Sequence, residues 1–119
     1  MITFDHVSKI FKGGKVAVDD MNLTVEKGEF ACFIGTSGSG KTTSMRMINR
    51  MIEPTKGKIL INDKDINELD PVELRRKIGY VIQNIGLMPH MTIRDNITLV
   101  PKLLKVPETE RSEIADRMI

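Results

Sequence analysis

The sequence predicts a mixed α/β fold, and three observations carry that prediction. Apolar and polar residues alternate over much of the first 25 positions, a pattern typical of strands. A glycine-rich stretch, Gly35–Thr43, lies between an apolar run and a helix-like segment. Helix-type patterns dominate after residue 90. Strands first and helices later indicate an α/β core with a helical piece attached near its end.

The elements before the glycine-rich stretch are expected to be strands. Ile2–Val7 and Met21–Val25 alternate, and a loop at Phe11–Gly14 separates them. Phe30–Ile34 is a near-continuous apolar run, which is typical of a strand covered on both faces and usually paired in parallel. Cys32 lies inside this run, so we expect it to be a small core residue.

A helix is expected to follow the glycine-rich stretch, over Thr43–Met51. Met45, Ile48 and Met51 lie about one helical turn apart and are expected to form the stripe that faces the core. Met47 lies off that stripe. The methionines are interpreted as packing residues, because a flexible thioether fills irregular gaps in a core.

The middle of the chain is expected to alternate short elements. Glu53–Gly57 ends the helix, Lys58–Ile61 is a short strand, and a turn follows at residues 62–63. Asp70 is the expected N-cap of a short helix that has Pro71 at its first position and Glu73 placed to complete a capping box. Tyr80–Gln83 is expected to be a further strand.

The last third is expected to be a loop followed by two helices. Residues 84–91 contain Gly86 and Pro89 and read as a loop. Thr92 caps a helix that runs to about residue 105 and is disturbed at Pro101. Pro107 then opens a final helix, Glu108–Ile119.

Composition narrows the function classes. A net charge of +2 disfavours a dedicated nucleic-acid binder, and the densest basic run, residues 75–77, is either a solvated helix end or a binding patch. One cysteine permits no intrachain disulfide and fits a reducing compartment. Nothing resembles a signal peptide or an apolar stretch of the ~20 residues needed to span a bilayer. His6 and His90 lack partners at metal-ligand spacing.

The glycine-rich stretch GTSGSGKTT has the pattern of a phosphate-binding loop. Glycines let the backbone turn tightly, so that successive N–H groups form a concave anion site next to a positive helix N-terminus. Lys41 is expected to reach the β- and γ-phosphates as a catalytic group, and the Thr42 hydroxyl to bind Mg²⁺. A flexible Gly/Ser turn is the alternative. The expected phosphate-binding residues are Gly35, Thr36, Ser37, Gly38, Ser39, Gly40, Lys41, Thr42 and Thr43.

Several ordered motifs around this loop resemble the ATP-binding subunit of an ABC transporter, over essentially all 119 residues. Phe11 precedes a Gly-Glu pair at residues 28–29, and PTKGKI follows the helix at residues 54–59. IGYVIQ, at residues 78–83, ends at Gln83 like the Q-loop strand of that family. The resemblance implies an ABC ATPase core over residues 1–91 and the start of the helical subdomain over residues 92–119.

The resemblance also implies roles for two residues outside the phosphate-binding loop. Phe11 takes the place of the aromatic residue that stacks on adenine; packing in the core is the alternative. Gln83 takes the place of the glutamine that reaches Mg²⁺ or the attacking water and relays nucleotide state; a plain polar loop residue is the alternative. ATP and Mg²⁺ are therefore the expected ligands.

The implied partners are integral membrane permease subunits and a second copy of the ATPase subunit, at the cytoplasmic face of the membrane. The loop after Gln83 docks on the permease in the family, which makes Leu87, Met88 and Met91 either a contact patch or residues packed within the chain. SMRMINRMIEPTKGKI, IGYVIQNIGLMPHMTI and NITLVPKLL are similar to importers of glycine betaine, carnitine or choline. A soluble ABC protein acting on nucleic acid or ribosomes, and a small P-loop kinase, are the alternatives.

Three family features are missing from this sequence: the acidic Mg²⁺ strand, the LSGGQ signature loop and the switch histidine. We therefore expect the chain to be the N-terminal part of a longer ATPase. Without the acidic strand, an uncovered sheet edge is expected to make the isolated chain marginal or self-associating. The isolated chain is also expected to bind nucleotide weakly and not to hydrolyse it.

Overall fold

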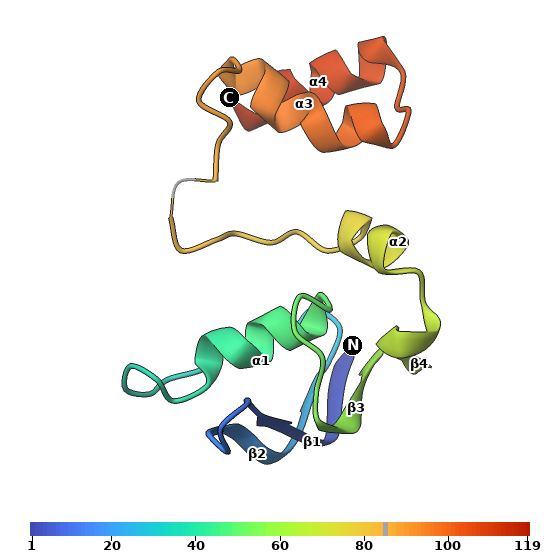
Figure 1. Ribbon diagram of the computed structural model, residues 1–119. Coiled ribbons are helices and arrows are strands. Elements are labelled where there is room, and N and C mark those ends of the chain that lie inside the picture. Colours follow the sequence, from blue (N-terminus) through green and yellow to red (C-terminus); the bar gives the residue numbers. More distant parts are fainter. Residues whose placement is uncertain (85) are drawn as a thin grey trace. The chain divides into compact units, whose positions relative to one another are not determined.

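The computed structural model describes residues 1–84 and 86–119, which divide into two units, Met1–Ile78 and Gly79–Ile119. The first unit contains a sheet, the glycine-rich loop and two helices, and the second contains two further helices (Figure 1). The mixed α/β class agrees with the sequence prediction. The functional boundary predicted between residues 91 and 92 stays a prediction.

A four-stranded antiparallel sheet of order β2-β1-β3-β4 organises the first unit. β1 (Ile2–Ile10) lies between β2 (Val16–Val25) and β3 (Lys56–Ile61), with register pairs such as Ile2 to Val25 on one side and Ile2 to Ile61 on the other. The strands predicted over Ile2–Val7, Met21–Val25 and Lys58–Ile61 are confirmed, and each is longer than predicted. The two-residue β4 (Lys64–Asp65) and the 3₁₀ helix η1 (Ile66–Glu68) were not predicted.

The helix α1 (Lys41–Ile48) packs on this sheet through a face that matches the predicted one only in part. Met47 is fully buried, whereas Met45 is 44% exposed and Met51 56% exposed, so the predicted stripe is wrong at these two residues. Ile48, its third member, is partly buried and packs against the core. Ser44 and Met47 are three residues apart and together form the buried face. Met51 lies beyond the helix end, where helical spacing no longer applies. The core comprises Phe4, Val7, Val18, Met47, Ile59, Ile66 and Leu74.

Two predicted strands, Phe30–Ile34 and Tyr80–Gln83, are wrong for the described structure. Both segments are irregular, with Phe30 91% exposed and Val81 96% exposed. A strand exists only where another strand satisfies its backbone groups. Among residues 1–84 and 86–119, both edges of β1 are taken by β2 and β3, and no strand pairs with either segment.

The helix α2 (Pro71–Arg76) begins at the predicted cap. The Asp70 carboxylate accepts hydrogen bonds from the N–H groups of Val72 and Glu73, both at 2.9 Å, and Pro71 takes the first helical position. Glu73 does not complete the capping box. Its carboxylate binds Arg76 at 2.9 Å instead, because three residues along a helix bring those side chains together.

Two arginines join the end of α1 to the segment that contains α2. Arg75 donates from Nε to the carbonyl of Asn49 at 3.0 Å and from Nη2 to the carbonyl of Arg50 at 2.8 Å. Arg50 donates in return to the carbonyl of Leu69 at 2.9 Å. These bonds satisfy carbonyls that the end of a helix leaves without partners. In the basic run of residues 75–77, Arg75 and Arg76 both bind groups of this chain, because Arg76 pairs with Glu73.

In the second unit, α3 (Ile93–Leu103) packs against α4 (Glu108–Met118). Thr92 caps α3 as predicted and forms a capping box with Asp95, which the sequence analysis did not identify. Pro101 lies inside α3, which continues to Leu103. Arg94 binds Ser112 at 3.2 Å and also Asp116, so side chains from both helices hold the pair together. The loop predicted over residues 84–91 includes Ile85, which lies outside the described residues.

Candidate functional site: the glycine-rich loop and its surroundings

The loop Gly35–Thr43 turns on two glycines with left-handed backbone. Gly38 has φ 82° and Gly40 has φ 89°, a region that side chains with a Cβ rarely adopt. A hydrogen bond from the Ser39 N–H to the Thr36 carbonyl, 3.2 Å long, closes the turn that contains Gly38. Gly40 is the N-cap of α1, so the loop delivers the chain directly into the helix.

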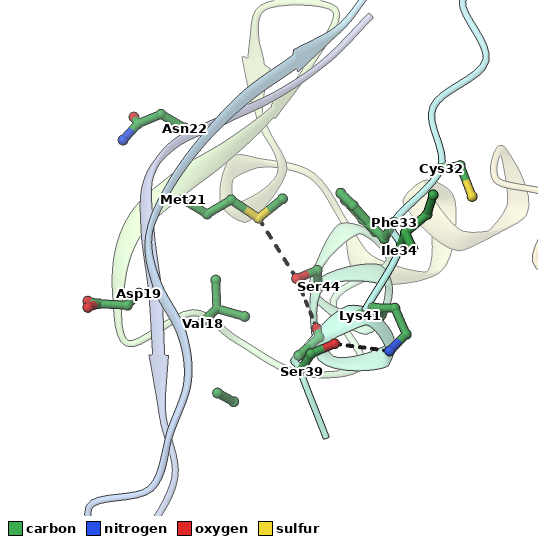
Figure 2. A pocket seen from close by; sticks show the side chains of 12 residues that line it. Val18, Asp19, Met21, Asn22, Cys32, Phe33, Ile34, Ser39, Lys41 and Ser44 are labelled. Atoms are coloured by element: carbon green, nitrogen blue, oxygen red, sulfur yellow. Dashed lines mark hydrogen bonds between the residues drawn. The ribbon is translucent and has the colours of Figure 1, made fainter. Parts of the chain in front are cut away.

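Gly40 has a second reason to be glycine. A Cβ at this position would lie 2.2 Å from the carbonyl oxygen of Ala17 in β2, far inside a van der Waals contact. The loop therefore rests against the backbone of the sheet. Ser44 strengthens the junction, because its hydroxyl donates to the Gly40 carbonyl at 3.0 Å and approaches the Met21 sulfur at 3.8 Å (Figure 2).

The loop surrounds the ammonium of Lys41. Nζ donates to the carbonyls of Gly35 and Thr36, at 2.8 and 2.7 Å, and to the Ser39 hydroxyl at 3.0 Å. The first turn of α1 contains no acidic residue, so nothing there neutralises the positive end of the helix dipole. A lysine ammonium and a helix N-terminus converge on one loop, which suits a polyphosphate.

Phe11 lies beside this loop. Its N–H donates to the Lys15 carbonyl at 2.9 Å, and its carbonyl accepts from the Gly14 N–H at 3.0 Å, so a closed turn fixes its backbone. Phe11 is 38% exposed and is absent from the core cluster. A cavity of about 150 Å³ is lined by Phe11, Lys15, Ala17, Gly38, Ser39, Gly40, Lys41, Thr42 and Thr43.

The structure thus brings together an aromatic ring and most of the predicted phosphate-binding residues in one cavity. That Phe11 stacks on a base stays a proposal, but packing in the core, the alternative, does not describe its surroundings. Thr42, the residue expected to bind Mg²⁺, also lines this cavity.

A second, larger cavity of about 640 Å³ lies between β2 and the start of the loop. Figure 2 shows Val18, Met21 and Asn22 on the side of the sheet and Cys32, Phe33 and Ile34 on the other. Cys32 is exposed, so its predicted place in the core is wrong. The reason is the one given for the whole Phe30–Ile34 run: no described strand covers it.

Gln83 belongs to the second unit, where it is exposed in an irregular segment. Its predicted roles toward Mg²⁺ and the attacking water therefore stay predictions. In the loop that follows, Leu87 is 58% exposed and Met88 is 45% exposed, whereas Met91 is partly buried. Exposed side chains favour a contact patch over packing within the chain for the first two of these residues.

Two residues that the sequence analysis missed support the site and this loop. Asn96 on α3 accepts from the Met88 N–H at 2.7 Å, and its amide donates to the carbonyls of Met88, Met91 and Thr92 at 2.9 to 3.3 Å. It thereby fixes the loop to the helix. Lys9 lies over the ring of Phe11, 5.3 Å from its centroid. No spacing rule predicts either contact, because each depends on chain segments meeting in space.

Two titratable groups have shifted pKa values, and neither lies in the loop. A hydrogen bond to Asp20, followed by the charge of that carboxylate, raises the pKa of His6 above 6.5. A hydrogen bond from the Thr92 side chain, followed by one from its backbone, lowers the pKa of Asp95 below 3.8. Both groups are fully exposed, so solvent screens these interactions.

The glycine-rich loop, its lysine and the helix N-terminus are the features of the phosphate-loop class of proteins. The chain belongs to the ABC transporter family, whose model matches residues 18–119. Among the described residues, the helices are all too short or too polar to span a membrane.

The chain is 67% identical over 119 residues to the carnitine transport ATP-binding protein OpuCA of Listeria monocytogenes, covering 100% of this chain and 30% of that protein. It is 64% identical over its whole length to the choline transport ATP-binding protein OpuBA of Bacillus subtilis, of which it covers 31%. It is 48% identical to the glycine betaine uptake system ATP-binding protein YehX of Escherichia coli, covering 99% of this chain and 37% of YehX. The chain therefore spans about a third of the length of these curated relatives.

Solved structures give the same fold. A dimeric ATP-binding cassette in a post-hydrolysis state, bound to ADP and Pi, matches with a TM-score of 0.83 and 35% identity. The match covers 98% of this chain and 55% of that one. The predicted fold, the N-terminal part of an ABC ATPase, is confirmed.

Proposed function

We propose that this chain is part of the ATP-binding and ATP-hydrolysing subunit of an ABC importer for quaternary-amine osmoprotectants. The observation that carries the proposal is the single cavity lined by Phe11 and the phosphate-binding loop. An aromatic face for a base and a cationic loop for phosphates suit a nucleoside triphosphate. The relatives named for carnitine, choline and glycine betaine support the solute class.

The residues of the site divide the work of binding ATP. The Phe11 ring offers a stacking surface, worth ~1–3 kcal/mol for a base. Lys41 leaves its carbonyl partners to bind the β- and γ-phosphates, and the loop amides bind the phosphate oxygens and stabilise charge in the transition state. The loop fits this ligand because its glycines leave no side chain between the backbone N–H groups and a phosphate.

Thr42 is the residue of the loop proposed to hold Mg²⁺, and the proposal that Gln83 also binds the ion rests on its sequence motif alone. A hard divalent cation prefers oxygen ligands, which a threonine hydroxyl and a glutamine amide supply. When bound, Mg²⁺ would neutralise phosphate charge during transfer to water. Gln83 would orient the attacking water and relay the nucleotide state to the loop after it.

The proposed partners are a permease in the membrane and a second copy of the subunit, which place the protein at the cytoplasmic face. Leu87 and Met88 supply an exposed apolar surface for the permease, and Asn96 orders the loop that carries them. The related cassette bound to ADP and Pi is dimeric, which supports pairing of two copies. We also propose that residues 1–119 alone bind nucleotide weakly and do not hydrolyse it, because the Phe30–Ile34 run beneath the loop is uncovered.

The test uses the full-length subunit together with its permease and binding protein in liposomes. Uptake of labelled glycine betaine, carnitine and choline is measured with internal ATP, alongside release of phosphate. We expect uptake of at least one of these solutes, and Lys41→Ala should abolish both uptake and hydrolysis. Purification of the native subunit with RNA or ribosomes, and without membrane subunits, would instead support the soluble ABC class.

A further inference from the structure

The end of β1 carries an ordered lysine beside the proposed base site. The Lys9 ammonium lies over the Phe11 ring, 5.3 Å from the centroid, within the range of a cation–π interaction. Lys9 lies near the end of β1, and Phe11 lies just beyond the strand, in the closed turn to Lys15. The contact therefore depends on how this turn holds the ring beside the strand.

The ammonium is held in place by a second contact. Nζ donates to the Glu53 carbonyl at 2.7 Å, in the segment that follows α1. Thr55 in the same segment binds the end of β1 at three points: its hydroxyl accepts from the Ile10 N–H at 3.0 Å and donates to the Ile10 carbonyl at 3.3 Å, and its N–H donates to the Ser8 carbonyl at 2.8 Å. The ring is thereby tied to the chain that leaves α1.

These hydrogen bonds link the segment that carries the Phe11 ring to the helix that begins in the phosphate-binding loop. α1 begins at Lys41 in the loop, and the chain after its other end holds Lys9 and Ile10. Phe11 lines the cavity beside the loop, and Lys9 is not among the residues that line it. The ammonium therefore contacts the ring without forming part of the cavity wall.

We propose that Lys9 is a positioning residue for the nucleotide base: its ammonium, fixed by the Glu53 carbonyl, holds the Phe11 ring so that the opposite face stacks on the base. This inference rests on the proposed function. A ring already fixed in its bound orientation loses less freedom when the base arrives, so binding is tighter.

The test compares ligands with and without a base on the full-length subunit. Lys9→Met keeps most of the length of the side chain and removes the charge. We expect it to weaken ATP binding about two- to fivefold, the equivalent of one cation–π contact at an exposed site. Binding of inorganic tripolyphosphate, which has no base, should not change. Lys9→Arg should restore the ATP affinity, because a guanidinium also stacks on an aromatic ring.

Lys12→Met is the matched control, since it removes the same charge from the turn next to Phe11. It should leave the ratio of ATP to tripolyphosphate affinity at the wild-type value. A double-mutant cycle with Phe11→Leu gives an independent measurement: once the ring is gone, Lys9→Met should have no further effect on ATP binding. In steady-state hydrolysis, Lys9→Met should raise KM for ATP and leave kcat unchanged.

The inference is overturned if Lys9→Met and Lys12→Met have the same affinity ratio, or if Lys9→Met weakens tripolyphosphate as much as ATP. A loss that persists in the Phe11→Leu background also overturns it. Failure of the proposed function gives a different result. In that case the wild-type subunit shows no ATP binding, or binding that Lys41→Ala leaves unchanged.

Discussion

Alanine substitutions at two glycines of the phosphate-binding loop can measure how tightly the loop packs against the sheet. Gly38 and Gly40 have nearly the same backbone, with φ of 82° and 89°. Alanine in this left-handed region costs ~1–2 kcal/mol at either position. Only at Gly40 would the new methyl meet a neighbour, the Ala17 carbonyl oxygen at 2.2 Å; at Gly38 nothing lies within 4 Å.

We therefore expect Gly40→Ala to destabilise the protein more than Gly38→Ala. Relieving the contact requires the loop or β2 to move, and such overpacking costs ~1–3 kcal/mol. Gly38→Ala should lose ~1–2 kcal/mol and Gly40→Ala ~2–5 kcal/mol of unfolding free energy. The assay is denaturant unfolding of the full-length subunit without nucleotide, so that no ligand contact enters the difference.

Gly57 provides a control outside the loop. Its φ is 74°, and a Cβ there would lie 2.2 Å from the His6 carbonyl oxygen and 2.5 Å from that of Asp5, so the position is at least as crowded as Gly40. Gly57→Ala should lower the unfolding free energy by at least as much and leave the ATP affinity of the folded protein unchanged. Gly40→Ala should lower both. Equal stability of the Gly38 and Gly40 variants would refute the packing argument, because their strain is the same.

Three further predictions concern other parts of the fold. Thr92→Ala should remove the capping box with Asp95 and raise amide exchange in the first turn of α3, with a loss of ~1 kcal/mol; Thr92→Ser should retain most of it. Arg75→Met should cost ~1 kcal/mol in unfolding free energy, whereas Arg76→Met should cost less, because only Arg75 binds the end of α1. The raised pKa of His6 means that its pair with Asp20 stabilises the fold fully below pH 6.5 and is lost as pH rises through the folded-state pKa. The unfolding free energy of His6→Ala should therefore change less with pH above 6.5 than that of the wild type. An equal slope in the two proteins would contradict the role of the His6–Asp20 pair.

Local signals in the sequence identified the elements whose formation depends on neighbouring residues. Asp70, Thr92 and Pro107 were assigned as helix starts, and each precedes a helix at the expected place. These devices act within a few residues, so a linear pattern contains all the information they need. The glycine-rich loop is of the same kind, because its turn geometry follows from its own glycines.

Burial was predicted less well, since it depends on what covers a segment. Met47, and not Met45, faces the core because the sheet lies on that side of α1. Phe30–Ile34 and Cys32 have the composition of a buried strand, yet no described strand pairs with them. Apolar residues favour burial, but a segment is buried only where other parts of the structure pack against it.

The sequence alone predicted the loop chemistry: glycines for the turn, Lys41 for phosphate, and an aromatic residue upstream. It also determined the family, because ordered motifs at fixed spacing leave little freedom of assignment. The tertiary structure alone decided that Phe11 and the loop share one cavity, that Ala17 excludes a side chain at residue 40, and that Lys9 lies over the Phe11 ring. The first two contacts join segments that are far apart in the chain, and the third depends on the Glu53 carbonyl, which holds the Lys9 ammonium. Packing brings these groups together, and sequence spacing does not predict it.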